Sequence, residues 1–220
     1  GTATEIGKSF ITCALLHHAT QIGLRAAGIK PVAAGTDADG KNEDVEAIRA
    51  ASNVVLADKV INPWSFKAAI APHIAAAEEG VSIDFAPILA ACDEARRQSD
   101  LLIVEGVGGF RVPLGVDRDS ADLAVALGLP VILVVGLRLG CINHALLTAE
   151  AIAARGLKLA GWVANCVAPD MPRRSENIAA LESRLGAPLL GIVPHLPGGD
   201  PAAAASHLKL PEIRSYNSPP

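Results

Sequence analysis

Aromatic side chains are scarce in this sequence of 220 residues. It has four Phe, two Trp and one Tyr, seven in all, although half of its residues are hydrophobic. The core must therefore be built from Ala, Val, Ile and Leu, a composition typical of helices packed on a parallel sheet. A chain of this length is long enough to bury one continuous core, and we expect a single sizeable domain.

Clustered positive charge and long apolar runs are also missing. Lys and Arg together number 19 against 23 Asp and Glu, which gives a net charge of −4. A nucleic-acid surface needs grouped Lys and Arg to neutralise phosphates, so we expect no nucleic-acid partner. No apolar run approaches the ~20 residues that span a bilayer, and no signal-peptide pattern is present, so we expect no membrane partner. Small molecules are the partners that this composition favours.

Paired cysteines are the third absence. Cys13, Cys92, Cys141 and Cys166 lie far apart, form no CxxC pair and sit in apolar surroundings. We interpret them as reduced core thiols of a cytoplasmic protein, with metal ligands or disulfides as the alternatives.

Apolar runs alternate with helical patterns along the chain, which is typical of parallel βαβ units. The pattern predicts an α/β fold with a doubly wound, mostly parallel sheet between two helical layers. We expect one domain over residues 1–196, a polar surface loop over 35–44 and a flexible tail over 197–220. The predicted strands fall within 23–32, 100–106, 130–136, 157–167 and 188–194, and the clearest helices within 6–23, 141–156 and 172–186.

The opening stretch GTATEIGKSF resembles a phosphate-binding loop with one residue too many. Five residues separate Gly1 from Gly7-Lys8-Ser9, where the usual motif has four. The physical requirements are nevertheless met: glycines flank a short loop, a helix begins at its end, and a lysine and a hydroxyl follow. The alternative is an ordinary helix cap beside a solvated lysine.

A carboxylate ends the apolar run DLLIVEGVGG. Glu105 lies where the carboxyl end of a buried strand is expected, which is the edge at which ligands bind in α/β sheets. Three of the next four residues are glycines, which allow close backbone approach. Since Mg²⁺ prefers hard oxygen ligands, Glu105 is a candidate metal ligand, with a simple loop carboxylate as the alternative.

Two further stretches follow predicted strands. Lys30 precedes Pro31 at the same edge, where a cation could stabilise charge on transferred oxygens, although a lone lysine is more often solvated. A helix is predicted to begin around residues 140–143, and its first amides could hold an anionic group such as a carboxylate. A plain strand-to-helix turn explains that segment equally well.

Taken together, these stretches resemble the dethiobiotin synthetase family. The loop spacing with the extra residue matches that family, and so do KPVAAG, NPWSF, VEGVGG, LGCINHALLTAEAI, LAGWVAN and GIVPHL, in the same order up to about residue 197. The resemblance implies a P-loop fold and a homodimer with the substrate at the subunit interface. It also implies ATP- and Mg²⁺-dependent joining of CO₂ to 7,8-diaminononanoate in biotin synthesis, through a carbamate and a carbamic-phosphoric anhydride.

The resemblance also implies residue roles. Lys8, Lys30 and Thr4 would be catalytic, and Mg²⁺ would face Ser9, Asp44 and Glu105. The nucleotide would contact Glu5, Ile6, Gly7, Lys8, Ser9, Phe10, Asp44, Glu105, Gly106, Val107, Gly108, Asn165, Cys166, Pro194, His195 and Leu196, with Asn165 reading the adenine. The diamine would contact Thr4, Lys30, Ala34, Gly140, Cys141, Ile142 and Asn143, the last four through its carboxylate and across the dimer interface.

The chain departs from the family pattern in three places. Ala3 stands where many members have Asp, Ala34 stands where many have Ser, and the strand expected before the loop would have to precede Gly1. Two other interpretations therefore stay open: an ATPase switch of the partitioning or cell-division-site type, and a degenerate synthetase that only binds nucleotide. The switch type carries an extra lysine near the start of the loop, where this chain has Thr2 and Ala3.

Overall fold

Short parallel strands alternate with helices along the chain. The structure, a computed structural model, describes residues 1–196 and 198–212. In chain order the elements are α1 (Lys8–Gln21), β1 (Ala26–Ile29), β2 (Val32–Ala34), α2 (Glu43–Ala51), α3 (Asp58–Ile61), β3 (Trp64–Phe66), α4 (Pro72–Glu78), α5 (Ala86–Gln98), β4 (Leu101–Val104), α6 (Ser120–Leu127), β5 (Val131–Gly136), α7 (Cys141–Ala154), β6 (Leu159–Asn165), α8 (Arg174–Glu182), β7 (Leu189–Val193) and α9 (Pro201–Ala204), which runs into a 3₁₀ turn at Ala205–His207.

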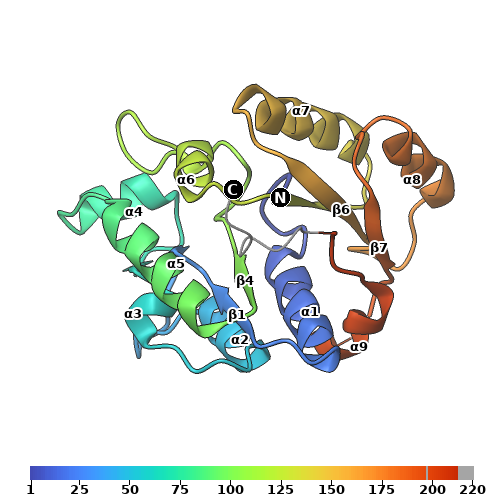
Figure 1. Cartoon of the computed structure of the whole chain (residues 1–220). Coiled ribbons are helices and arrows are strands. Elements are labelled where there is room, and N and C mark those ends of the chain that lie inside the picture. The colour runs from blue at the N-terminus through green and yellow to red at the C-terminus, as the bar shows by residue number, and fades with distance from the viewer. Residues whose placement is uncertain (197, 213–220) are drawn as a thin grey trace.

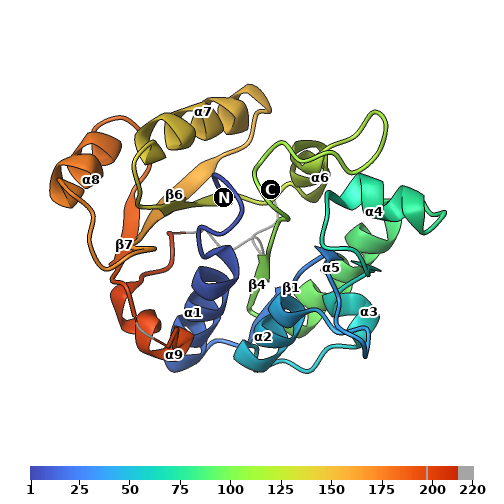
Figure 2. The same ribbon diagram turned by 180° about the vertical axis from the view of Figure 1, so that it is seen from behind.

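Within the described strands, every ladder is parallel. β1 pairs with β4, β2 pairs with β3, and β6 lies between β5 and β7. Helices cover both faces of these strands, with α7 and α8 on one side of β5–β7 and α1 with α9 on the other (Figure 1; Figure 2 gives the reverse view). The expected α/β fold with parallel strands between helical layers is confirmed, but the described strands form three separate sheets where one continuous sheet was expected.

Small aliphatic side chains alternate between two cores around β5–β7. Leu133 and Val135 pack with α7 and α8, whereas Val134 points to the opposite face and packs with α1 and α9. This is the two-residue period of a strand buried on both sides. Trp162, on β6, is completely buried in the α7 and α8 core.

The other half of the molecule is built around β1 and β4. Ala26 of β1 belongs to a core with α1 and α2, and Ala27 packs toward α5 on the other face. Gly28 is required here because a Cβ would come within 2.6 Å of Ile48 and 2.7 Å of Leu16. A glycine in the strand therefore lets α1 and α2 pack closely against β1.

Two strands were not predicted. β2 and β3 are three residues each, too short for their apolar pattern to show a period, and they pair with one another. Trp64 of β3 stacks on Phe66 and donates its indole N–H to the Asp84 carbonyl at 2.9 Å. Trp64 therefore lies in a short strand and also ties that strand to the segment before α5.

The segment expected to be a flexible tail forms regular structure over part of its length. Asp200 caps α9 by accepting from the Ala202 amide at 2.9 Å, and Pro201 occupies the first helical position. Ala204 and Leu208 are buried in the core under α1, and the Lys209 amide donates to the Leu190 carbonyl. Residues 198–212 thus differ from the expectation because a few small apolar side chains suffice to anchor them. Residues 197 and 213–220 lie outside the described residues.

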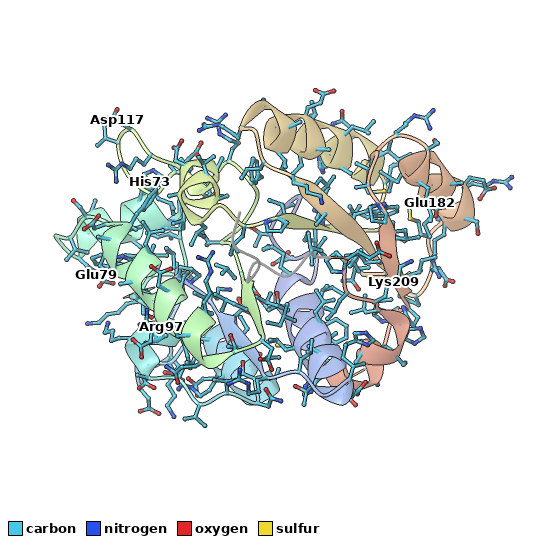
Figure 3. All side chains as sticks on the ribbon, in the orientation of Figure 1. His73, Glu79, Arg97, Asp117, Glu182 and Lys209 are labelled. Atoms are coloured by element: carbon cyan, nitrogen blue, oxygen red, sulfur yellow. The ribbon has the colours of Figure 1, made fainter. Side chains whose placement is uncertain are left out.

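Most charged side chains lie on the surface, but Lys30 and Glu105 are buried. Glu79, Arg97 and Glu182 are exposed, and Glu79 accepts a hydrogen bond from the Lys67 amide (Figure 3). All four cysteines are buried and unpaired. No helix within the described ranges is both long and apolar enough to cross a bilayer.

Candidate active site

The loop before α1 is shaped to turn backbone amides inward. Glu5 and Gly7 both have left-handed φ angles, 58° and 81°, and Gly7 is the residue that precedes the helix. No side chain caps the first turn of α1, so its amides remain available to a ligand. Left-handed residues alternating with helical ones form an anion-binding concavity, and the positive end of the helix dipole favours negative charge there.

The loop is held against the sheet by two contacts. Asn165, at the end of β6, donates its side-chain N–H to the Ile6 carbonyl at 2.9 Å. Gly136, at the end of β5, leaves room for Ile6, since a Cβ there would lie 2.9 Å from the Ile6 side chain. The ends of two neighbouring strands therefore fix the curvature of the loop.

Next to the loop lies a buried cluster of ions. Lys30, between β1 and β2, forms ion pairs with Asp44 in the first turn of α2 and with Glu105 after β4, the latter at 2.9 Å. The Ser9 hydroxyl donates to the same Glu105 oxygen at 2.7 Å. Lys30 is 5% exposed and Glu105 4% exposed, so this pair is shielded from water, whereas the Asp44 side chain is partly exposed. Removing one partner from such a buried pair is strongly destabilising because it leaves an uncompensated charge.

The charges in this cluster shift one another's proton affinities. Burial alone would lower the pKa of Lys30, but the Glu105 and Asp44 carboxylates outweigh it and raise that pKa above the ordinary lysine value. Burial would likewise raise the pKa of Asp44, but its bond with the Lys30 ammonium is stronger and lowers it. Lys30 is therefore a cation, and Asp44 an anion, throughout the neutral range.

Lys8 faces the loop from the start of α1. Its ammonium donates to the Ala3 carbonyl at 2.8 Å. Burial, together with the nearby positive charge of Lys30, lowers the pKa of Lys8. An anion between the two lysines would be favoured by both charges.

One oxygen of this site lacks a partner. Oε2 of Glu105 is buried and has no hydrogen-bond partner among the described residues, although its Oε1 has two. A buried carboxylate oxygen left open beside a hydroxyl and a second carboxylate is the kind of oxygen set that Mg²⁺ accepts, with phosphate oxygens completing its shell. Ser9, Asp44 and Glu105 therefore fit a magnesium ion.

A family model and a curated relative each match nearly the whole of this chain. A family model described as an AAA domain matches residues 1–203. The ATP-dependent dethiobiotin synthetase BioD of Aromatoleum aromaticum is 60% identical over 214 residues, which cover 96% of this chain and 95% of that protein.

The chain belongs to the dethiobiotin synthetase family.

Distant solved structures share its fold. The MinC:MinD cell division complex of Aquifex aeolicus matches with a TM-score of 0.57 at 13% identity and covers 98% of this chain and 97% of the matched one. MinD of the same organism matches with a TM-score of 0.58 at 14% identity, covering 94% and 90%. At such low identity these likenesses support the P-loop α/β fold and carry no argument about activity.

Five of the site residues predicted from the dethiobiotin synthetase resemblance come together in the structure. Ser9, Lys30, Asp44 and Glu105 are linked by hydrogen bonds and ion pairs, and Lys8 lies close enough for their charges to act on its pKa. Asp44 was expected from a surface loop, but it lies in the first turn of α2. That helix placement gives the carboxylate a defined position beside Lys30.

The remaining predicted residues surround this group at different depths. Thr4 is exposed and lies beside the glycine segment, since a Cβ at Gly108 would be 3.8 Å from the Thr4 hydroxyl. Ala34 ends β2, and its carbonyl accepts from Asn42. The described polar contacts join neither the 140–143 segment nor the 194–196 segment to the ion cluster, so their expected roles stay predictions. The side chains of Ile6 and Cys166 are buried, those of Glu5 and His195 are exposed, and Gly106 is open to solvent.

Sequence reasoning missed three polar residues that hold this site together. Asn62 donates to the carbonyls of Lys30 at 2.6 Å and Trp64 at 2.9 Å, and so fixes the backbone around Lys30. The Ser120 hydroxyl donates a hydrogen bond to the Phe110 carbonyl and accepts one from the Val112 amide, and so anchors the segment that follows Glu105. Asn42 precedes α2. Each of these residues bridges backbone groups, and a single sequence gives no signal of such bridges apart from asparagine and serine next to predicted turns.

Proposed function

We propose that this chain catalyses the ATP-dependent formation of dethiobiotin from 7,8-diaminononanoate and CO₂. The observation that carries the proposal is the buried Lys30, held between Asp44 and Glu105 beside the phosphate loop. High identity to a dethiobiotin synthetase over nearly the whole chain supports the reaction class, a carbon–nitrogen ligase with small-molecule substrates.

The phosphates of ATP would lie on the start of α1. The first amides of the helix and the Lys8 ammonium supply positive charge from two directions. Lys8 would exchange its bond to the Ala3 carbonyl for a phosphate oxygen. Gly7 is required in this turn because its φ of 81° is left-handed and a Cβ there would lie 2.2 Å from the Asn165 side chain.

Magnesium would be held by the open oxygen of Glu105, by Asp44 and by the Ser9 hydroxyl. When bound, it would neutralise charge on the β- and γ-phosphates. Lys30 pairs with both carboxylates but carries a single positive charge, so one negative charge remains for the ion to compensate.

Lys30 would act on the reacting end. In the proposed sequence, CO₂ bonds to one amine of the diamine to form a carbamate, and a carbamate oxygen attacks the γ-phosphorus as ADP leaves. The second amine then attacks the carbonyl carbon, and phosphate leaves as the ring closes. A fixed ammonium beside the γ-phosphate stabilises the oxygens on which negative charge grows, and Thr4 lies at the loop surface where the diamine would enter.

The remaining assignments follow from the family. We propose a homodimer in which the amides of the 140–143 segment hold the substrate carboxylate, and a cytoplasmic location. The left-handed Gly140 and the uncapped first turn of α7 support the carboxylate assignment, because no side chain competes for the amides of Ile142 and Asn143, whereas the Cys141 amide donates to the Arg138 carbonyl. The adenine would lie near Asn165 and the 194–196 segment.

A phosphate-release assay tests the proposal. ATP hydrolysis should require both the diamine and bicarbonate, and product analysis should show one dethiobiotin for each phosphate. Phosphate release that is independent of the diamine would reject the synthetase activity and favour a nucleotide switch.

A further inference from the structure

Asn42 is a buried polar residue that the reaction itself does not use. Its side-chain oxygen accepts from the Val45 amide at 3.2 Å and so caps α2. Its side-chain N–H donates to the Gly35 carbonyl at 2.8 Å and to the Ala34 carbonyl at 3.4 Å. One amide group therefore ties the end of β2 to the first turn of α2.

The segment between these two points is exposed and has few other ties. Residues 37–41 lie on the surface, and the main bonds within them are internal, from the Asp39 and Lys41 amides to the Asp37 carboxylate. Gly35 itself is anchored to β3 through the Phe66 carbonyl. The side chain of Asn42 is thus the direct bridge from this anchored strand end to the helix that follows.

Asp44 depends on this bridge for its position. It lies two residues beyond Asn42, in the same helical turn, and its carboxylate is 44% exposed. Its partner Lys30 lies between β1 and β2, on a different segment. A shift in the position of the first turn of α2 would therefore move the Asp44 carboxylate relative to Lys30. A displacement of about 1 Å at a reacting centre can cost on the order of a hundredfold in rate.

We infer that Asn42 is a positioning residue, which holds the Asp44 carboxylate in the place where it can bind magnesium. This inference rests on the proposed function for the role of Asp44. A helix cap alone would need only the side-chain oxygen, which aspartate and serine supply equally well. Helix capping does not explain the two hydrogen bonds that the Asn42 side chain donates to the carbonyls at the end of β2.

Two substitutions separate the cap from the bridge. Asn42→Asp and Asn42→Ser both keep an oxygen that caps α2, and both lose the donor pair to Gly35 and Ala34. The serine variant adds no charge, so agreement between the two excludes an effect of the new carboxylate. By charge alone, that carboxylate would favour a cation rather than repel it.

Asn53 offers a matched control. It stands beyond the other end of α2, accepts from the Ala26 amide at 2.7 Å and donates to the Leu24 carbonyl at 3.0 Å. Asn53→Asp therefore removes the same kind of donor and adds the same charge just beyond the other end of α2, remote from Lys30. It should lower thermal stability without altering metal dependence.

The deciding measurement is the affinity for ADP by calorimetry, with magnesium and with a chelator. Both Asn42 variants should bind ADP as the wild type does in chelator, but should lose roughly three- to thirtyfold of their affinity in magnesium. The magnesium concentration for half-maximal turnover should rise in parallel. Asn53→Asp should match the wild type in both conditions.

Several outcomes would overturn the inference. Unchanged magnesium dependence in both Asn42 variants, with only a lower melting temperature, would make Asn42 a structural cap. An equal magnesium effect in Asn53→Asp would make the effect general to α2. If the wild type makes no dethiobiotin, the proposed function fails, yet ADP binding needs no turnover and still decides the role of Asn42.

Discussion

Two helices of this molecule, α1 and α7, begin in the same way but stand in different surroundings. Each follows a glycine with a left-handed φ, 81° at Gly7 and 92° at Gly140, and neither first turn is capped by a side chain. The start of α1 adjoins Lys30 and Glu105, whereas the 140–143 segment takes part in none of the ion pairs within the described residues. Backbone geometry thus favours an anion at the start of both helices. Charged side chains that follow neighbouring strands, Lys30 and Glu105, adjoin only the start of α1.

The largest effect should come from removing the cation that distinguishes the α1 site. Lys30→Ala should lower turnover by roughly two to three orders of magnitude, because charge growing on the transferred oxygens loses its stabiliser. Steady-state kinetics with the exposed Lys59→Ala as control measures this. Turnover near that of the wild type would remove Lys30 from the mechanism.

Lys30→Ala should also lower the thermal stability, because it leaves the Asp44 and Glu105 carboxylates without their cation. Glu105 would be buried without its cation, so the melting temperature should fall and then recover when magnesium is added, since the ion replaces the missing charge. If the melting temperature of Lys30→Ala did not change on addition of magnesium, the ion would have to bind elsewhere.

Adding a methyl group at the two helix starts should have unequal effects. In Gly7→Ala, the new Cβ would come within 2.2 Å of the Asn165 side chain, and alanine resists the left-handed φ. We expect the KM for ATP to rise at least about tenfold, since the strain alone is worth roughly 1–2 kcal/mol. An unaltered KM for ATP would contradict the assignment of this loop to the phosphates.

Gly140→Ala is the milder counterpart. Nothing lies within 4 Å of the added Cβ, so only the backbone strain remains. The KM for the diamine should rise by roughly three- to tenfold while the KM for ATP stays constant. The reverse pattern, with ATP affected and the diamine not, would show that the two helix starts have been assigned the wrong ligands.

The smallest effect concerns acid stability, to which the ion pair between Lys30 and Asp44 near the start of α1 should contribute. Since the pKa of Asp44 is lowered in the folded protein, its stabilisation is complete above the ordinary carboxyl pKa of about 4 and is lost as the pH falls through the lower folded value. In chelator, Asp44→Asn should melt below the wild type at neutral pH, and the gap should close in acid. A gap that stays constant with pH would show that the Asp44 charge is not what stabilises the fold.

The sequence was most informative where one local pattern determines the structure. The glycine spacing before Lys8 predicted the loop at the start of α1, and the apolar run before Glu105 placed that residue after a buried strand. The helices α1, α7 and α8 followed from periodicity. These features are read within a few residues of one another. They also carry the family resemblance.

The parts that were missed depend on contacts distant in the chain. The Lys30–Glu105 pair joins residues 75 positions apart, and the amide of Asn62 acts on a backbone carbonyl 32 positions away. The start of α2 at Glu43 follows from the cap by Asn42 rather than from hydrophobic periodicity. A sequence pattern shows which polar residues are present, but tertiary packing decides which backbone groups they reach.

The scarcity of aromatic residues gives this molecule a simple optical signature. Its two tryptophans lie in different halves: Trp162 is enclosed between β6 and α8, and Trp64 belongs to the short strand that follows Asn62. Tryptophan emission moves to longer wavelength as the indole meets water. Trp64→Phe and Trp162→Phe would each leave a single tryptophan. Fluorescence of Trp162→Phe would then report on unfolding near β2 and β3, and that of Trp64→Phe on unfolding of the β5–β7 half, without an added dye.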